Sequence, residues 1–288
     1  MAFVYYIIIL PLSRLPFWVL YRISDFLFVI VYYLIGYRKK VVRKNIENSF
    51  PDRTIEELRQ IERKFFRHFC DLIVESVKAF TISEKEIQQR VQHHNPDLIN
   101  TYLGQGKHVT MVGGHYGNWE LYAVNVAMHI DLQPIALFTP LQNKFMNSKI
   151  KNSRSKYGLW MMRYNEIKEV IKKGEIQTAV IFGADQCPKK NQKPHWMQFL
   201  NQETGVQFGT EKFARDNNTP VIYGNIYKLK RGYYQVRYQL ICEDPTTMEV
   251  GMITEAHTKL LEKDIIKEPE YWLWSHKRWK RKRKDFKN

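Results

Sequence analysis

The sequence predicts an α/β fold, with a central mixed, mostly parallel sheet flanked by helices and an N-terminal membrane-associated helix. In the second half of the chain, short apolar runs typical of buried strands alternate with helical stretches. Residues 3–36 form one strongly apolar segment. The 288 residues, of which 44% are hydrophobic and 26% charged, exclude a disordered chain and suffice for one large domain with a sizeable core.

The apolar segment at residues 3–36 has neither the basic start nor the small-residue cleavage site of a signal peptide, so we expect it to be retained. Residues 15–35 are long enough to span a bilayer. However, Arg22 and Asp25 lie near the middle, where each charge costs about 2.5–3.5 kcal/mol. Because these two residues are one helical turn apart, they could pair. A spanning helix, an interfacial anchor and a buried core helix therefore remain alternatives.

The apolar segment is followed directly by the basic stretch RKKVVRK at residues 38–44. Basic residues beside an apolar segment are typical of a cytoplasmic flank that contacts anionic lipids. The whole chain carries a formal net charge of +16, which attracts polyanions such as nucleic acid, lipid headgroups or an acidic protein. The flank therefore predicts that the bulk of the chain lies on the cytoplasmic side.

A long helix is predicted from about residue 54 to residue 80. Thr54 and Glu57 match the capping-box pattern that starts many helices. Apolar residues then recur at helical spacing: Leu58, Ile61, Phe65, Phe66, Phe69, Leu72, Ile73 and Val77. Ser83 and Glu86 indicate the start of a second, shorter helix.

The elements of the sheet follow. Buried strands are predicted at residues 108–114, 134–138, 178–183 and 220–227. Helices are predicted between them at residues 118–130, 141–157, 165–174 and 209–217. The run at 233–241 follows Arg231 and Gly232 so closely that we expect it to pair with the preceding strand as a hairpin. A final helix is expected at 250–266. Such alternation predicts a sheet covered on both faces.

The stretch GGHYGNWE at residues 113–120 carries the candidate chemistry, because its first half ends a predicted strand and its second half starts a helix. His115 lies at this junction, where α/β sheets usually place reactive groups. A neutral imidazole can take the proton of an attacking hydroxyl. We expect the Glu120 carboxylate to fold back onto the other ring nitrogen and fix its tautomer. Three glycines would let a substrate approach the backbone: Gly113, Gly114 and Gly117.

HYGNWE resembles the motif of the late-acting acyltransferases of lipid A biosynthesis, the lauroyl/myristoyl type within the H-x4-D/E glycerolipid acyltransferase superfamily. The similarity covers nearly the whole chain and includes the segments LPFWVLYRISDFLF, YRKKVVRKNIENSFP, NSRSKYGLWMMRYNEIKEVIKKGE, GADQ and YWLWSHKRWK. It implies a membrane anchor with basic flank over residues 1–45 and an acyltransferase catalytic domain with a basic tail over residues 46–288. It also implies the bacterial inner membrane as the location.

The resemblance further implies acyl carrier protein as the acyl donor and a hydroxyl of a lipid A precursor as the acceptor. Because the acceptor's own hydroxyl would be the nucleophile, we expect no acyl-enzyme. No cofactor or metal is expected. Arg154 matches the functional arginine of the family, with Arg163 as the competing choice for binding an oxyanion or a phosphate. Asp185 in GADQ matches an acidic position that could orient Arg154 or His115. Asn118 and Gln186 are further substrate-binding candidates. The loop after GADQ departs from the family pattern, so acyl chain length is not carried over.

Two functional alternatives remain: the same chemistry on an aminolipid or another glycolipid, and a non-catalytic basic membrane-binding protein. The basic tail at residues 276–288 fits anionic lipid, acyl carrier protein or nucleic acid. No nucleic-acid-binding motif is present, so nucleic acid is not an expected partner. The cysteines are far apart and odd in number, which predicts neither a disulfide framework nor a zinc site: Cys70, Cys187 and Cys242.

Overall fold

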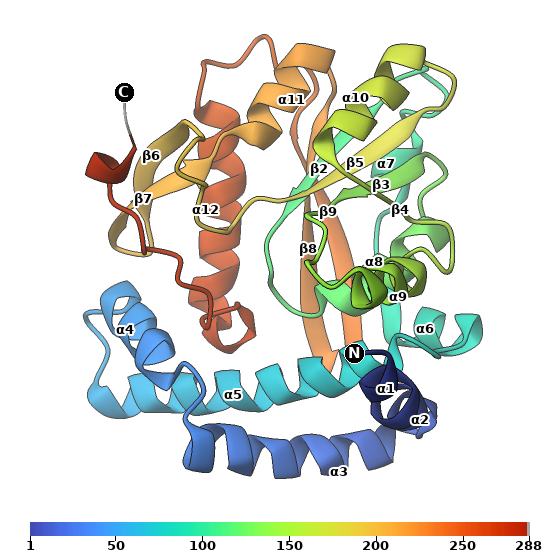
Figure 1. Cartoon of the computed structure of the whole chain (residues 1–288). Coiled ribbons are helices and arrows are strands. Elements are labelled where there is room, and N and C mark those ends of the chain that lie inside the picture. The colour runs from blue at the N-terminus through green and yellow to red at the C-terminus, as the bar shows by residue number, and fades with distance from the viewer. Residues whose placement is uncertain (287–288) are drawn as a thin grey trace.

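The computed structural model describes residues 1–286, so the last two residues of the predicted basic tail lie outside the described residues (Figure 1). A seven-stranded sheet with the order β1-β9-β8-β2-β5-β3-β4 forms the centre. Only the β8–β9 pair is antiparallel within this described sheet, which confirms the mixed, mostly parallel prediction. The strands are β1 (Val91–His93), β2 (Val109–Gly113), β3 (Gln133–Leu137), β4 (Trp160–Met162), β5 (Thr178–Gly183), β8 (Val221–Lys230) and β9 (Tyr233–Cys242).

Side chains on opposite faces of the strands enter two separate hydrophobic clusters, because successive residues of a strand point in opposite directions. On β2, Val112 belongs to the first cluster and Met111 to the second. The first cluster includes residues of α4 (Lys39–Ser49), α5 (Ile55–Lys78), α10 (Tyr164–Lys173), α11 (Gly209–Asn217) and α12 (Met252–Lys267). The second includes residues of α6 (Glu84–Arg90), α7 (Asp97–Asn100) and α8 (Trp119–Asn125). The sheet is therefore covered on both faces, as predicted.

The predicted elements match the structure closely, with additions. The Thr54–Glu57 capping box is present at the start of α5, and Ser83 caps α6. The predicted helix at 141–157 is shorter, α9 (Lys144–Arg154), and the edge strand β4 follows it. The loop after GADQ contains a second, antiparallel sheet that was not predicted, made of β6 (Pro194–Phe199) and β7 (Gln202–Gln207). Short 3-10 helices are η3 (Val126–Met128), η4 (Pro269–Tyr271) and η5 (Arg283–Asp285).

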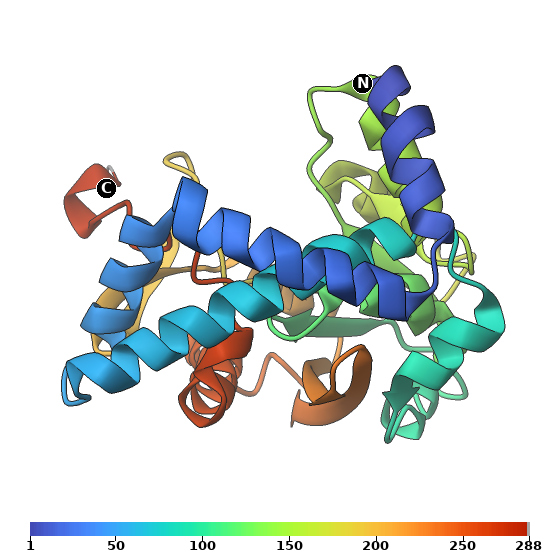
Figure 2. The same ribbon diagram turned by 90° about the horizontal axis from the view of Figure 1, so that it is seen from below.

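The N-terminal segment folds into helices that lie along the domain. These are α1 (Ala2–Val4), η1 (Tyr5–Ile9), α2 (Leu10–Arg14), α3 (Phe17–Phe28) and η2 (Val29–Ile35). Residues 17–35 form a continuous helical stretch of 19 residues with a window of mean hydropathy 1.6, which makes them long and apolar enough to cross a membrane by length and composition. In Figures 1 and 2, α3 runs beside α5 across the end of the sheet. The following helix α4 joins the core through the buried Val42 and Ile46.

Candidate active site

His115 and Asp185 meet because they follow two neighbouring parallel strands. Strand β2 ends at Gly113 and pairs in parallel with β5, which ends at Gly183, so the loops after the two strands begin side by side at the carboxyl end of the sheet. The His115 Nδ1 and Asp185 Oδ1 atoms are 2.7 Å apart. The imidazole lies against the end of β5, where a Cβ on Gly183 would be only 3.2 Å from the ring. A glycine at this position therefore makes room for the ring.

Asp185 is buried, with 7% of its surface exposed, and its second oxygen is fully engaged. Oδ2 accepts hydrogen bonds from the backbone N–H of His115 at 3.0 Å and from Trp272 Nε1 at 2.9 Å. Burial raises the pKa of Asp185, but the His115 charge and these hydrogen bonds outweigh it, and the pKa falls well below its ordinary value. Asp185 is thus an ionised carboxylate that can only accept hydrogen bonds.

Since Asp185 only accepts, the proton between the two side chains belongs to Nδ1 of His115, and Nε2 keeps a free lone pair. Burial lowers the pKa of His115, but the charge and hydrogen bond of Asp185 raise it above its ordinary value overall. The charge of Glu120 raises this pKa further, and that of Arg154 lowers it. Nε2 lies 3.3 Å from the side-chain amide nitrogen of Gln186. His115 is therefore a hydrogen-bonded imidazole whose second ring nitrogen faces the side-chain amide of Gln186.

Glu120 is bound to Arg154, in contrast to its predicted place on the imidazole. Arg154 Nε and Nη2 donate to the two carboxylate oxygens of Glu120 at 2.9 and 2.6 Å, in a bidentate arrangement. The predicted hydrogen bond between Glu120 and His115 is absent, because Asp185 is the carboxylate that binds Nδ1 of His115. The physical reason is that Asp185 comes from the adjacent strand, a relation that the spacing of His115 and Glu120 along one segment does not contain. Glu120 acts on His115 through its charge.

The remaining candidates lie in different settings. Arg163 precedes α10 and pairs with Glu166 at 2.7 Å, with 56% of its side chain exposed, at the end of edge strand β4. Asn118 is fully buried and caps α8, where its oxygen accepts from the N–H of Leu121 and its amide donates to Glu75. Among the predicted residues, the structure brings His115, Asp185 and Gln186 together beside the Glu120–Arg154 pair, while Asn118 holds the start of α8.

The segment of residues 271–278, here called the closing segment, holds the loop between β2 and α8 in place. Tyr116 and Trp272 form an antiparallel bridge. Leu273 N–H donates to the carbonyl of His115 at 3.1 Å, and Gly117 N–H donates to the carbonyl of Tyr271 at 3.0 Å. Gly117 has φ +63°, and a Cβ there would clash with Ile226, so the loop needs glycine at this position.

Trp272 was not identified from the sequence as a site residue, although it lies in the YWLWSHKRWK motif. The signal was a cluster of tryptophans, which ordinarily indicates a core or an interface. The closing segment is itself attached to helix α4, because Asn45 Nδ2 donates to the carbonyls of Trp274 and His276 at 2.9 and 3.0 Å. His276 accepts from the N–H of Cys187 at 3.1 Å, and burial lowers its pKa to about 4, so it is neutral.

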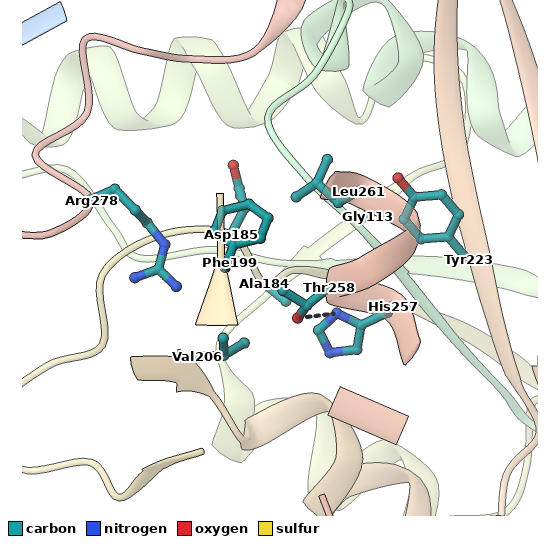
Figure 3. A pocket seen from close by; sticks show the side chains of 10 residues that line it. All are labelled: Gly113, Ala184, Asp185, Phe199, Val206, Tyr223, His257, Thr258, Leu261 and Arg278. Carbon is teal, nitrogen blue, oxygen red and sulfur yellow. Dashed lines mark hydrogen bonds between the residues drawn. The ribbon is translucent and has the colours of Figure 1, made fainter. Parts of the chain in front are cut away.

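A small cavity adjoins Asp185, and Figure 3 shows that residues of the central sheet, the β6–β7 hairpin, α12 and the closing segment line it. Its volume of about 10 Å³ offers room for a single water molecule. Arg278 lines it and is only 3% exposed. Burial lowers the pKa of Arg278 to about 10, and the charge of Asp185 opposes this effect. Within residues 1–286, no three His, Cys, Asp or Glu side chains are grouped so that they could hold a metal ion.

Comparisons with known proteins converge on one family. The family model for bacterial lipid A biosynthesis acyltransferases matches residues 1–281. The chain is 24% identical over 248 residues to the lipid A biosynthesis palmitoleoyltransferase of Escherichia coli (strain K12), which covers 84% of this chain and 79% of that protein. It is 24% identical over 275 residues to the lipid A biosynthesis lauroyltransferase of the same organism, covering 93% and 87%. A lipid A biosynthesis acyltransferase of Shigella flexneri matches at 24% over 248 residues.

Proposed function

Because this chain belongs to the bacterial lipid A biosynthesis acyltransferase family and is an acyltransferase, we propose that His115 is the general base of its transfer reaction. The donor would be acyl carrier protein and the acceptor a hydroxyl of a lipid A precursor. The observation that carries this proposal is the 2.7 Å hydrogen bond between His115 Nδ1 and Asp185, which leaves Nε2 as an acceptor at the carboxyl end of the parallel strands.

The reaction proceeds in two steps. The acceptor hydroxyl displaces Gln186 from Nε2 of His115, gives its proton to this nitrogen, and its oxygen attacks the carbonyl carbon of the acyl thioester. The tetrahedral intermediate then collapses, the carbon–sulfur bond breaks, and the imidazolium returns the proton to the leaving thiolate. The products are an ester and a free thiol, with His115 neutral again. The acceptor oxygen is itself the nucleophile, so no acyl-enzyme forms.

Each neighbouring charge has a part in these steps. Asp185 holds the ring in the tautomer that leaves Nε2 free, and stabilises the imidazolium that forms. Arg154 lies close enough for its charge to lower the pKa of His115. A guanidinium in this place suits the developing oxyanion or a phosphate of the acceptor, and Glu120 positions it through two hydrogen bonds. Glu120 is accordingly a positioning residue, in place of the direct partner of His115.

We also propose which part of the chain binds the membrane, which part is catalytic, and where the protein lies in the cell. Residues 1–45 form the membrane anchor with its basic flank, and residues 46–288 form the catalytic domain, on the cytoplasmic side of the bacterial inner membrane. The basic residues of the stretch 38–44 support the cytoplasmic orientation. Residue 45 falls within α4, which packs on the domain, so the division is one of function and the two parts share a core.

Transfer of a labelled acyl chain tests the proposal. Detergent-solubilised wild-type protein is expected to move the chain from acyl carrier protein to a lipid A precursor, as measured by thin-layer chromatography of the lipid product. Acyl-coenzyme A as donor and an aminolipid or another glycolipid as acceptor are the matched controls. A folded protein that acylates only a control lipid, or uses only coenzyme A, would contradict the acceptor or the donor while it remains an acyltransferase.

The charge of Glu120 predicts a pH effect. Because this carboxylate raises the pKa of His115, Glu120→Gln is expected to lower that pKa, so that Nε2 stays unprotonated to lower pH. The acid limb of the pH profile of kcat/KM therefore moves to lower pH, while the loss of one Arg154 contact lowers the maximal rate. Glu120→Asp keeps the charge and serves as the control. An unchanged acid limb in Glu120→Gln would show that the observed limb belongs to another group.

A further inference from the structure

The N-terminal helices expose many large apolar side chains. Half of the large apolar side chains that the described structure exposes come from residues 3–35, and they are here called the apolar face: Phe3, Val4, Tyr6, Ile7, Ile8, Trp18, Phe26, Val29, Tyr33, Leu34 and Ile35. Trp18 is 71% exposed and Phe26 66%. Figure 2 shows α3 outermost over α5, with the short N-terminal helices set at an angle to it. Many exposed large apolar side chains gathered in one segment of a folded chain indicate a contact with a partner or a membrane.

Polar side chains on the buried face of α3 and at its flank attach this helix to the domain. Ser24 Oγ donates to Asp71 Oδ1 at 2.8 Å, and Arg231 pairs with Asp25 at 2.8 Å. Near the start of the helix, Tyr21 donates to Glu75, which is completely buried. These contacts join α3 to α5 and to the β8–β9 hairpin, because Asp71 belongs to α5 and Arg231 to the turn of the hairpin.

The attachment of α3 to α5 and the hairpin bears on whether α3 spans a bilayer or lies on its surface. Helix α5 lies along α3 and exposes three arginines one turn apart: Arg59, Arg63 and Arg67. The guanidinium of Arg67 lies 4.8 Å from the centre of the Phe28 ring, near the middle of residues 17–35. A spanning α3 would therefore carry Arg67, as well as the Asp25–Arg231 pair, into the hydrocarbon. Charged side chains at that depth are strongly unfavourable.

The chemistry around the apolar face fits the boundary between headgroups and acyl chains. Trp and Tyr side chains favour this boundary, and Trp18, Tyr6 and Tyr33 are exposed on the face. Exposed basic residues of the same segment suit anionic headgroups: Arg14, Arg22, Arg38 and Lys40. Arg22 lies one turn from both Trp18 and Phe26, and its long side chain can reach the headgroups while its stem stays among apolar groups. A second copy of this chain would place its own positive charges against these basic residues. An anionic lipid surface would instead neutralise them.

We infer that the apolar face is an interfacial membrane contact, in which α3 lies in the plane of an anionic bilayer and does not cross it. This inference concerns attachment and does not rest on the proposed reaction. It also places the site beside the lipid. Tyr5 contacts Phe145 of α9 with ring centroids 5.7 Å apart, and Lys149 Nζ is 3.2 Å from the hydroxyl of Tyr6. Arg154 ends the same helix, so the bilayer surface borders the element that carries it.

Vesicle flotation tests the surface. Full-length protein is expected to float with vesicles that contain phosphatidylglycerol, and less with pure phosphatidylcholine. Phe26→Glu is expected to weaken this binding by about tenfold or more, because burial of one large apolar side chain is lost. Val250→Glu is the matched control, since Val250 is 75% exposed and lies outside the apolar face. His115→Ala, which removes the proposed base, is expected to float like wild type, so failure of the reaction and failure of attachment are distinguishable.

A labelling experiment tests the orientation of α3. Single cysteines replace Arg14 and Tyr37, on either side of the helix, in a Cys187→Ser/Cys242→Ser background. Both are expected to react with an impermeant maleimide from the same side of sealed vesicles or spheroplasts. Reaction of one end only, with the other exposed by detergent, would establish a spanning helix and overturn the inference. Equal losses of flotation in Phe26→Glu and Val250→Glu, or a vesicle-independent dimer that Phe26→Glu dissociates, would overturn it as well.

Discussion

Replacement of His115 by alanine is expected to lower kcat for acyl transfer by about 10²- to 10⁴-fold, the range that general-base catalysis contributes. The acceptor hydroxyl then has no group to take its proton, and Nε2, the only ring nitrogen left free by Asp185, is lost. The measurement is the initial rate of transfer from labelled acyl carrier protein to the lipid acceptor, with KM determined separately for each substrate.

Two controls separate chemistry from folding in this experiment. His94→Ala removes an exposed histidine elsewhere on the chain and is expected to leave the rate unchanged. The thermal unfolding of His115→Ala, followed by circular dichroism, is expected to remain cooperative. A folded His115→Ala protein that retained wild-type kcat would contradict the assignment of the base, whereas a rise in KM alone would give His115 a binding role.

Asp185→Asn is expected to lower the rate by about 10²- to 10⁴-fold through the wrong tautomer of His115. The oxygen at Oδ2 accepts from two N–H groups, those of His115 and Trp272, so the amide oxygen of asparagine must take this place. The amide NH₂ then faces Nδ1 of the ring and donates to it. Nδ1 becomes an acceptor, the ring proton moves to Nε2, and the basic nitrogen is blocked.

Trp272→Phe provides the companion test, because it removes one of the two donors to Oδ2 and keeps an aromatic ring in the core. Alone, it is expected to reduce the rate modestly and to lower the free energy of unfolding by about 1–3 kcal/mol, since an N–H partner of a buried charge is lost. The nitrogen chemical shifts of His115 in both variants report the tautomer, and the transfer rates report its effect on catalysis. Asp185→Asn with the wild-type tautomer and rate would contradict this account.

Several elements were predictable because their signals are local. The Thr54–Glu57 capping box and the apolar spacing behind it define α5, and both lie within a few turns of one helix. The apolar runs that became β2, β5 and β8 read as buried strands for the same reason. The β6–β7 hairpin was not predicted, because β6 mixes polar with bulky apolar residues and β7 has Val206 as its one large apolar residue, so neither strand shows an apolar run or a regular alternation.

The sequence by itself determined the class of the fold, the place of His115 at the end of a strand, and the resemblance that the family comparison confirmed. Only the tertiary structure decided which carboxylate touches the imidazole. Asp185 and His115 are 70 positions apart and meet through the β2–β5 pairing, whereas Glu120, five positions away, turns to Arg154. Local periodicity encodes each element, but contacts between elements arise from packing. For the same reason, only the packing of α3 on α5 indicates whether the apolar segment spans a membrane or lies on its surface.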